Sequence, residues 1–379
     1  MMRHISLFTS LIFSVLLLSA CGGKSKTTSV SAHGDTITLH YANNLSLVRH
    51  KEYTVAQLKN PWDTTKILHT YILIDKQLPL PKELPGGTII RTPLSKAVVY
   101  SSVHCSLLEQ LGAIKSIAGV CDLKYINLPE IHDACQEGEI ADIGDGLNPD
   151  IEKIIDLHPD AILLSPFENS GGYGRIEKLN VPIVECADYM ETSALGRAEW
   201  MRFYGLLFGK TKAADSLFTR VEENYNTLKE RVKQEKDRPT VMADLKTSST
   251  WYTPGGRSTV AGLYADAGAD YIFKEDVHSG SLPLSFEAIL EKGQQADFWL
   301  IKYNQAKDKT YKELESDYAP YSGFQAFKAR HIYGCNTYTV PFYEESPFHP
   351  DWYLEDLIKI FHPSLLKAHQ LRYFTKLAD

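Results

Sequence analysis

The sequence predicts an α/β protein with two Rossmann-like lobes of parallel sheet joined by a long helix, and with a strand-rich extension before the first lobe. Short, almost wholly apolar segments alternate with helical patterns on both sides of residues 191–237, as in parallel sheets that are buried on both faces. Residues 195–236 carry a long helical pattern. Residues 35–91 instead hold short Thr-rich and aromatic-rich segments separated by Asn, Pro and Gly, which favour antiparallel strands.

The beginning of the chain has the pattern of a lipoprotein signal peptide. A basic start at Arg3 precedes an apolar run at 5–18, and Leu-Ser-Ala then leads to Cys21. The apolar run is too short to span a bilayer. We expect residues 1–20 to be removed, Cys21 to be acylated, and residues 21–34 to form a flexible tether. The protein would then face the periplasmic side of a bacterial membrane; a buried N-terminal helix is the alternative.

The extension at 35–91 is predicted to be a layer of short antiparallel strands. The first lobe, at 92–190, is predicted to alternate strands with helices. The extension strands are expected at 36–41, 45–48, 53–58 and 69–74; the lobe strands at 97–101, 116–120, 161–165 and 182–186; and the lobe helices at 105–111, 151–157 and 176–179.

Residues 191–237 are predicted to be the helical connection between the lobes. A helix at 198–208 is apolar nearly all round, and Gly209 can close it in the left-handed conformation. A second helix at 212–236 ends before Pro239. Its apolar residues recur at three- and four-residue steps and predict one buried stripe. The stripe comprises Leu217, Val221, Tyr225, Leu228 and Val232.

The second lobe, at 238–379, repeats the alternation. In each half a Glu, either Glu152 or Glu287, stands near the start of a short helix that leads to a buried strand, which indicates an internal duplication. The strands are expected at 240–244, 271–273, 297–301 and 331–333, and the helices at 258–267, 285–291, 324–329 and 352–361.

Composition argues against several classes of function. The net charge is −7, so no basic field exists for nucleic acid or an anionic lipid surface. The 13 histidines are scattered without an H-x-H motif, and we predict no metal site. The adjacent acids Glu344 and Glu345 are typical of a solvated loop.

Five cysteines remain after Cys21, and no C-x-x-C motif occurs among them. Cys121 and Cys135 are close in sequence, and the expected compartment is oxidising. We therefore predict a disulfide between them that closes the 122–134 loop, with Cys105 as a competing partner.

Ligands of open α/β sheets bind at the carboxyl ends of the strands. The corresponding loops lie at 101–104, 122–125, 166–173, 248–257 and 302–305, and they combine aromatic side chains with Gly, Asn and Arg. Such loops suit a large, partly flat ligand, although the aromatics could instead cap the lobe cores and His104 could serve at a helix start. The candidate ligand-binding residues are Ser102, His104, Tyr125, Phe167, Asn169, Trp251, Tyr252, Arg257 and Tyr303.

Taken together, these features resemble the ABC-transporter substrate-binding proteins for iron–siderophore, haem and cobalamin uptake. The resemblance covers about residues 92–366 and depends on the order and spacing of several runs. Besides the lipobox, these are Asn-Pro-Asp-Ile-Glu at 148–152, His-Pro-Asp-Ala-Ile-Leu at 158–163, Gly-Lys at 209–210, Ala-Gly-Ala-Asp at 267–270 and Phe-Glu-Ala-Ile-Leu at 286–290.

The resemblance implies a lipid-anchored, monomeric, non-enzymatic protein without a cofactor. It would capture a metal chelate between two lobes, a ferric siderophore or cobalamin before haem, and deliver it to an ABC permease with its ATPase. It further implies that Glu152 and Glu287 meet arginines on the permease; favourable placement at a helix dipole is the simpler account of both. A tetrapyrrole chelatase-like enzyme and a surface adhesin are alternatives from other classes.

Overall fold

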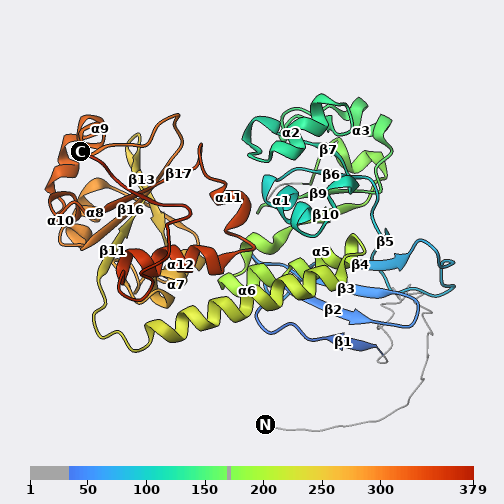
Figure 1. Cartoon of the computed structure of the whole chain (residues 1–379). Helices are drawn as coiled ribbons and strands as arrows, with labels where there is room; N and C mark the ends of the chain where they lie inside the picture. The colour runs from blue at the N-terminus through green and yellow to red at the C-terminus, as the bar shows by residue number, and fades with distance from the viewer. Residues whose placement is uncertain (1–33, 169–171) are drawn as a thin grey trace, which may run out of the picture.

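The computed structural model describes residues 34–168 and 172–379, and Figure 1 shows two α/β lobes on one side of a long helix. The predicted signal peptide, Cys21 and nearly all of the tether lie outside the described residues. We call the part built on strands β6–β10 the N-lobe, the part built on β11–β18 the C-lobe, and helices α4–α6 the interlobe spine. Within the described ranges, no helix is both long and apolar enough to cross a membrane.

The N-lobe sheet is parallel throughout, in the strand order β10-β9-β6-β7-β8. The order reverses between β6 and β9, which is where an open α/β sheet forms a crevice for ligands. The strands are β6 (Ala97–Val99), β7 (Ile117–Val120), β8 (Ala141–Asp142), β9 (Ala161–Leu164) and β10 (Ile183–Glu185), and the helices are α1 (Ser102–Gln110), α2 (Pro129–Gln136) and α3 (Ile151–Leu157).

The main C-lobe sheet has the order β14-β11-β16-β17-β18, with β18 antiparallel and a reversal between β11 and β16. A small antiparallel sheet, β12-β13-β15, accompanies it. The strands are β11 (Thr240–Ala243), β12 (Lys246–Thr247), β13 (Thr250–Pro254), β14 (Asp270–Tyr271), β15 (Ser281–Leu284), β16 (Phe298–Tyr303), β17 (Ile332–Asn336) and β18 (Thr375–Lys376). The helices are α7 (Thr259–Asp266), α8 (Phe286–Gly293), α9 (Tyr311–Asp317), α10 (Gln325–Lys328), α11 (Phe342–Glu345) and α12 (Pro350–Phe361).

The two lobes therefore share an architecture but differ in strand order. The duplication inferred from the sequence is wrong for whole lobes, because the two sheets differ in strand order. In the N-lobe, β6 has two strands on each side, whereas in the C-lobe β11 has one strand on one side and three on the other. The duplication holds locally, since α3 leads to β9 and α8 leads to β16, and each of these strands pairs with the first strand of its own sheet.

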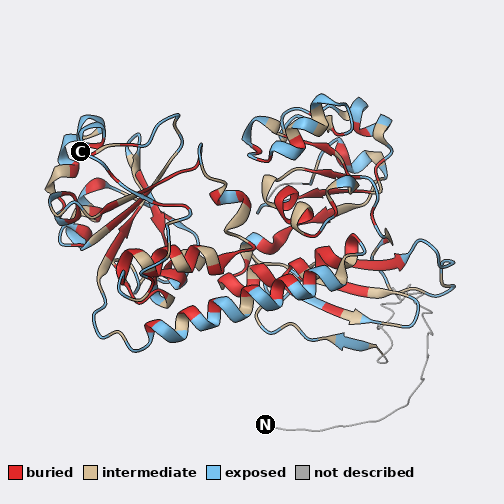
Figure 2. Cartoon of the chain, viewed as in Figure 1, coloured by how far each residue is buried: buried red, intermediate tan, exposed pale blue. Residues whose placement is uncertain are grey.

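The interlobe spine consists of α4 (Ala194–Glu199), α5 (Met201–Leu207) and α6 (Thr211–Val232). The apolar run predicted as one helix is divided at Trp200, which ends α4 and begins α5. The stripe predicted for α6 is confirmed: its five residues are all buried, and Figure 2 shows the buried face of this helix turned toward the lobes.

The extension forms a separate five-stranded sheet in sequential order, with four antiparallel strands and β5 parallel to β4. Tyr71 links this sheet to the N-lobe, since its hydroxyl donates to the Ile183 carbonyl at 3.1 Å and accepts from the Glu185 amide at 2.8 Å. The exposed edge of β10 is thereby capped. The strands are β1 (Asp35–Ile37), β2 (Leu45–Arg49), β3 (Thr54–Lys59), β4 (Ile67–Asp75) and β5 (Thr88–Thr92).

Two buried carboxylates attach the extension to the spine. The Glu199 carboxylate accepts three successive backbone amides, those of residues 40, 41 and 42, at 2.8–3.0 Å. The Glu191 carboxylate accepts the next two amides, those of residues 43 and 44, and the indole N–H of Trp200 at 2.9 Å. Both side chains are almost fully buried. A carboxylate out of water is tolerated when several donors surround it, so the loop and the two acids depend on one another.

We predict that Glu199→Ala lowers the free energy of unfolding by about 3 kcal/mol, because three part-buried amides lose an acceptor that is itself fully buried. The exposed Glu223→Ala on α6 is the matched control and should change it by less than about 0.5 kcal/mol. Urea denaturation followed by circular dichroism measures both. Equal stability of the two variants would contradict this account of the extension.

Candidate functional site

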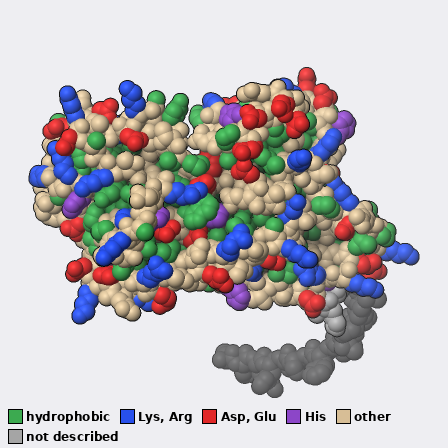
Figure 3. All heavy atoms as spheres, in the orientation of Figure 1, with side chains coloured by type: hydrophobic (Ala, Val, Ile, Leu, Met, Phe, Trp, Pro, Cys, Tyr) green, Lys and Arg blue, Asp and Glu red, His purple; other side chains and the backbone are tan. Residues whose placement is uncertain are grey.

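A cavity of about 620 Å³ lies between the two lobes. The space-filling view shows the furrow in which the lobes meet, with acidic and basic side chains interspersed over the visible face rather than gathered by sign (Figure 3). Both lobes line the cavity, and most of its side chains are hydroxyl, amide or aromatic groups. The N-lobe contributes Ser102, Lys124, Tyr125 and Asn127, and the C-lobe contributes Lys302, Tyr303, Asn304, Thr337, Tyr338, Tyr343 and Glu344.

The fold brings these residues together because they follow the carboxyl ends of parallel strands. Ser102 opens α1 directly after β6, and Tyr125 lies in a short turn after β7. On the other side, Tyr303 ends β16 and Tyr338 follows β17. Strand ends of this kind are where open α/β sheets place their ligands.

A partly buried ion pair marks the strand reversal of the C-lobe. Lys302 on β16 and Asp244, which follows β11, lie 2.6 Å apart (Nζ to Oδ1). Burial alone would lower the pKa of Lys302, but the Asp244 carboxylate outweighs burial and raises it. Lys302 is therefore a cation at neutral pH, and the Asp244 carboxylate balances most of its charge.

Two tyrosines of the cavity, Tyr303 and Tyr343, are neutral hydroxyl donors. Burial raises the pKa of Tyr303 to about 12 and raises the pKa of Tyr343 as well. Neutral phenols do not repel an anion, and they can donate hydrogen bonds to its oxygens. Lys124 stands at the N-lobe side with its ammonium 4.7 Å from the centre of the Tyr125 ring. The cavity thus combines two cations with several neutral donors.

Direct hydrogen bonds cross the cavity from lobe to lobe. The Asn127 side-chain amide donates to the Thr337 carbonyl at 3.3 Å, and the Asn127 backbone amide donates to Glu344 at 3.4 Å. Glu344 is 3% exposed, and burial raises the pKa of its carboxyl. Asn127 and Glu344 therefore contact each other where a bound ligand would meet both lobes.

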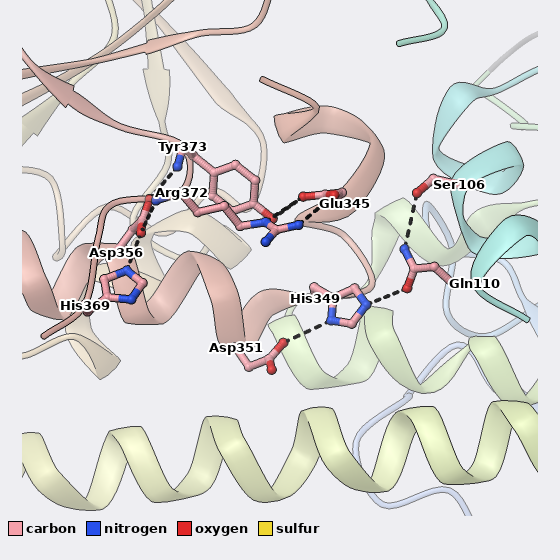
Figure 4. Close-up of polar contacts among 9 residues, drawn as sticks. All are labelled: Ser106, Gln110, Glu345, His349, Asp351, Asp356, His369, Arg372 and Tyr373. Carbon is pink, nitrogen blue, oxygen red and sulfur yellow. Dashed lines mark hydrogen bonds and ion pairs between the residues drawn. The ribbon is translucent and has the colours of Figure 1, made fainter. Parts of the chain in front are cut away.

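Beneath the cavity, α1 of the N-lobe meets the turn between α11 and α12 of the C-lobe (Figure 4). His349 bonds to the Gln110 side-chain oxygen at 2.5 Å, so its Nε2 must carry the hydrogen, and Gln110 in turn donates to Ser106 at 3.3 Å. The Arg372 guanidinium holds α11 through two hydrogen bonds to Glu345, of 2.8 and 2.9 Å. These contacts form the floor on which the lobes meet.

His104 was predicted to bind ligand, and this is wrong in the structure. It is 3% exposed, and its Nε2 lies 2.9 Å from Asp188, with Tyr204 and Arg197 also bonded to that carboxylate. Burial opposes its protonation, but neighbouring Cys186 and Asp188 raise the pKa of His104 to about 10. The His104–Asp188 pair fixes α1 to the spine and positions Ser102 at the cavity.

Trp251 was also predicted to line the site, and it lies instead in the C-lobe core. It is fully buried, donates its indole N–H to the Ala243 carbonyl at 3.0 Å and stacks on Trp299. The loop expected at 248–257 is largely strand β13, whose alternation turns Trp251 inward and Tyr252 outward. Tyr252 and Arg257 are exposed and line neither this cavity nor the N-lobe pocket described below.

Of the other predicted residues, Ser102, Tyr125 and Tyr303 line the interlobe cavity. Phe167 lines a neighbouring N-lobe pocket, and Asn169 lies outside the described residues. Sequence reasoning named the loops that contain Lys124, Lys302 and Asn304 but did not select these side chains. It missed Asn127 and residues 337–344, because the acidic pair at 344–345 is typical of a solvated loop, whereas Glu344 is buried.

The predicted disulfide is absent from the structure. Cys121 and Cys135 are both free thiols, and they pack in different hydrophobic clusters. Cys135 lies in the last turn of helix α2, which the sequence did not predict, whereas Cys121 directly follows β7. Burial raises the pKa of Cys121 to about 12, which keeps it unreactive. In the described part of the chain, no group of three or more His, Cys, Asp or Glu side chains could hold a metal ion.

Glu152 and Glu287 are both exposed in the first turns of their helices. The helices begin alike, since the caps Asp150 and Ser285 each accept a backbone amide from the first turn. The backbone amide of Glu287 and the Ser285 hydroxyl lower the pKa of Glu287, so this carboxylate is ionised. The pair thus places one exposed carboxyl group on the surface of each lobe.

Residues 97–339 match a family model described as periplasmic binding protein. An uncharacterized lipoprotein of Methanocaldococcus jannaschii is 28% identical over 372 residues, covering 92% of this chain and 87% of the relative. Two solved structures have similar folds: a molybdate-binding periplasmic protein of Haemophilus influenzae (TM-score 0.57, 19% identity, 74% of this chain and 90% of that one) and a Saccharomonospora viridis protein of an Fe3+-hydroxamate transport system (TM-score 0.55, 16% identity, 71% and 94%).

We predict that Glu344→Gln raises the melting temperature at pH 8 and that this gain disappears near pH 4. The raised pKa means that stability contributed by protonated Glu344 is present below the unfolded-state pKa and is lost as the pH rises through the folded-state value. Calorimetry across this range measures the difference, with exposed Glu315→Gln as control. A gain that is the same at every pH would contradict burial as its cause.

Proposed function

The chain belongs to the periplasmic binding protein family, and from this premise we propose that it is the lipid-anchored substrate-binding component of an ABC importer. In this role it captures a metal chelate between its lobes, outside the cytoplasm, and delivers it to the membrane permease and its ATPase. It acts by binding and release rather than by catalysis, and it works as a monomer. The N-terminal pattern ending at Cys21 and the match to a named lipoprotein support the anchor.

The observation that carries this proposal is a cavity lined from both lobes by phenols, amides and lysines. Its volume of about 620 Å³ lies within the range of small-molecule sites, roughly 300–1,000 Å³. Lys124 and Lys302 attract anionic oxygens, and the neutral phenols donate hydrogen bonds to them. We therefore favour a chelate rich in hydrogen-bond-accepting oxygens, with a ferric siderophore first and cobalamin and haem as the other candidates. One of the two similar structures is named for molybdate and the other for Fe3+-hydroxamate transport, so we choose among ligand classes from the cavity of this protein.

We predict that the protein retains a ferric siderophore through gel filtration at a 1:1 ratio. The test incubates it with ferrioxamine B, cyanocobalamin and haem separately, and the absorption spectrum of the eluted protein identifies the ligand. Tyr125→Ala and Tyr338→Ala, one in each lobe, should each weaken affinity by about 1–2 kcal/mol. Tyr252→Ala removes an equally exposed tyrosine away from the cavity and should not. Retention of none of the three ligands would refute the proposed ligand classes.

We also propose that Glu152 and Glu287 are the contacts to the permease, one on each lobe. The double variant Glu152→Ala, Glu287→Ala should keep full ligand affinity but lose most chelate uptake in cells, since charge pairs at a rim govern encounter and orientation. Glu137→Ala with Glu315→Ala removes one exposed glutamate from each lobe elsewhere and is the matched control. Normal uptake by the first variant at equal abundance would rule out this docking surface.

A further inference from the structure

The N-lobe contains a second cavity, of about 530 Å³, which we call the N-lobe pocket. It lies at the strand reversal of this lobe, because its walls include Ser101 after β6 and Leu164 and Ser165 at the end of β9. A strand reversal is the position at which an open α/β sheet binds ligands. The interlobe cavity uses the corresponding reversal of the C-lobe, at Asp244 and Lys302.

The rim of the pocket is unusually apolar for a protein surface. Leu147 is 95% exposed and Phe167 is 58% exposed, and both line the pocket with Ile151 and Tyr173. Exposed apolar side chains gathered at a cavity mark a binding site more often than isolated ones do. Two of the polar groups that line the pocket have partners: the Tyr173 hydroxyl donates to Glu185 at 2.7 Å, and the Asp122 carboxylate accepts the Gly146 amide at 3.2 Å. The Tyr100 hydroxyl also lines the pocket and is buried, and it has no hydrogen-bond partner among the described residues.

The segments that carry these side chains are held in place. Three hydrogen bonds shape the turn around Leu147: its amide donates to Asp145, the Asn148 amide donates to the Asp145 carbonyl, and the Asp150 amide donates to the Ile143 carbonyl, at 2.8–3.1 Å. The Tyr189 hydroxyl donates to the Pro166 carbonyl at 2.5 Å, next to Phe167. Leu147 therefore projects from a hydrogen-bonded turn, and its exposure is a property of the fold.

The N-lobe pocket and the interlobe cavity share two stretches of wall. Ser101 lines the pocket and Ser102 lines the cavity, as successive residues at the start of α1. Asp122 lines the pocket while Lys124 and Tyr125 line the cavity, all on one short segment after β7. The two cavities therefore adjoin along these two segments, which would allow one elongated ligand to place its metal-binding part among the lysines and phenols and its apolar part beside Leu147 and Phe167.

We propose that the N-lobe pocket binds an apolar arm of the transported chelate, so that the substrate class is an amphiphilic chelate with an oxygen-rich metal-binding head and an acyl or aryl chain. This inference rests on the proposed function. The test compares two ferric tris-hydroxamates of equal charge, ferrioxamine B acylated on its free amine with either an acetyl or an octanoyl group. Their affinities are measured by quenching of intrinsic fluorescence.

The octanoyl chelate should bind the wild type at least tenfold more tightly than the acetyl chelate. Leu147→Ser and Phe167→Ser should abolish that preference while leaving the affinity for the acetyl chelate unchanged. Val277→Ser removes another exposed apolar side chain, 61% exposed in the C-lobe, and should retain the preference. Equal affinity of the wild type for both chelates would overturn the inference and leave the proposed function standing.

A second measurement tests whether the N-lobe pocket binds an apolar molecule when no chelate is present. The apolar fluorescent anion 1-anilinonaphthalene-8-sulfonate should bind the wild type saturably at one site, and Leu147→Ser with Phe167→Ser should lower this affinity at least fivefold. If neither chelate binds but the dye binds as expected, the proposed chelate transport is wrong, and the N-lobe pocket is still a binding site for apolar groups. If the dye shows no saturable site, the N-lobe pocket is not a binding site.

Discussion

The attachment of residues 40–44 to Glu191 and Glu199 is the contact on which the rest of the arrangement depends. Five successive amides converge on two carboxylates that have almost no access to water, and an unpaired carboxylate there would be costly. Glu199 lies on α4 together with Arg197, and Tyr204 lies on the next helix, α5. Arg197 and Tyr204 both bond to Asp188, which in turn bonds to His104 of α1. A chain of side-chain contacts thus connects the extension, through the spine, to α1, whose first residue, Ser102, lines the interlobe cavity.

The cavity combines weakly opposed charges with many neutral donors. Lys302 remains protonated because it forms an ion pair with Asp244. The two opposite charges nearly cancel, so the pair adds little net charge to the cavity. The phenols remain protonated across the physiological range and donate without repelling an anion. Asn127 and Glu344 connect the two walls directly, and the His349–Gln110 bond connects them again at the floor. A ligand between the lobes would add to contacts that already exist.

The fold was largely predictable from the sequence, because apolar strands and the α6 stripe depend on local periodicity. The candidate site was predictable in its loops and less so in its side chains. Ser102 and Tyr125 follow β6 and β7, Tyr303 ends β16, and the predicted ends of these three strands lie within two residues of the observed ones. Trp251 was misplaced because the alternation of β13 becomes visible only when β15 pairs with it. Glu344 was missed because its burial depends on contact with Asn127, more than 200 residues away in the chain. Cys135 similarly lies in helix α2, which the sequence did not predict.

The central claim is that one ligand is held by both lobes at once. A crystal structure of the protein with the chelate that it retains in gel filtration tests this most directly. The account predicts the chelate between the lobes, with its metal-binding head within contact distance of Tyr125 on one side and of Lys302 and Tyr303 on the other. A chelate that contacts a single lobe, or that lies against the extension while the interlobe cavity holds water, would contradict it.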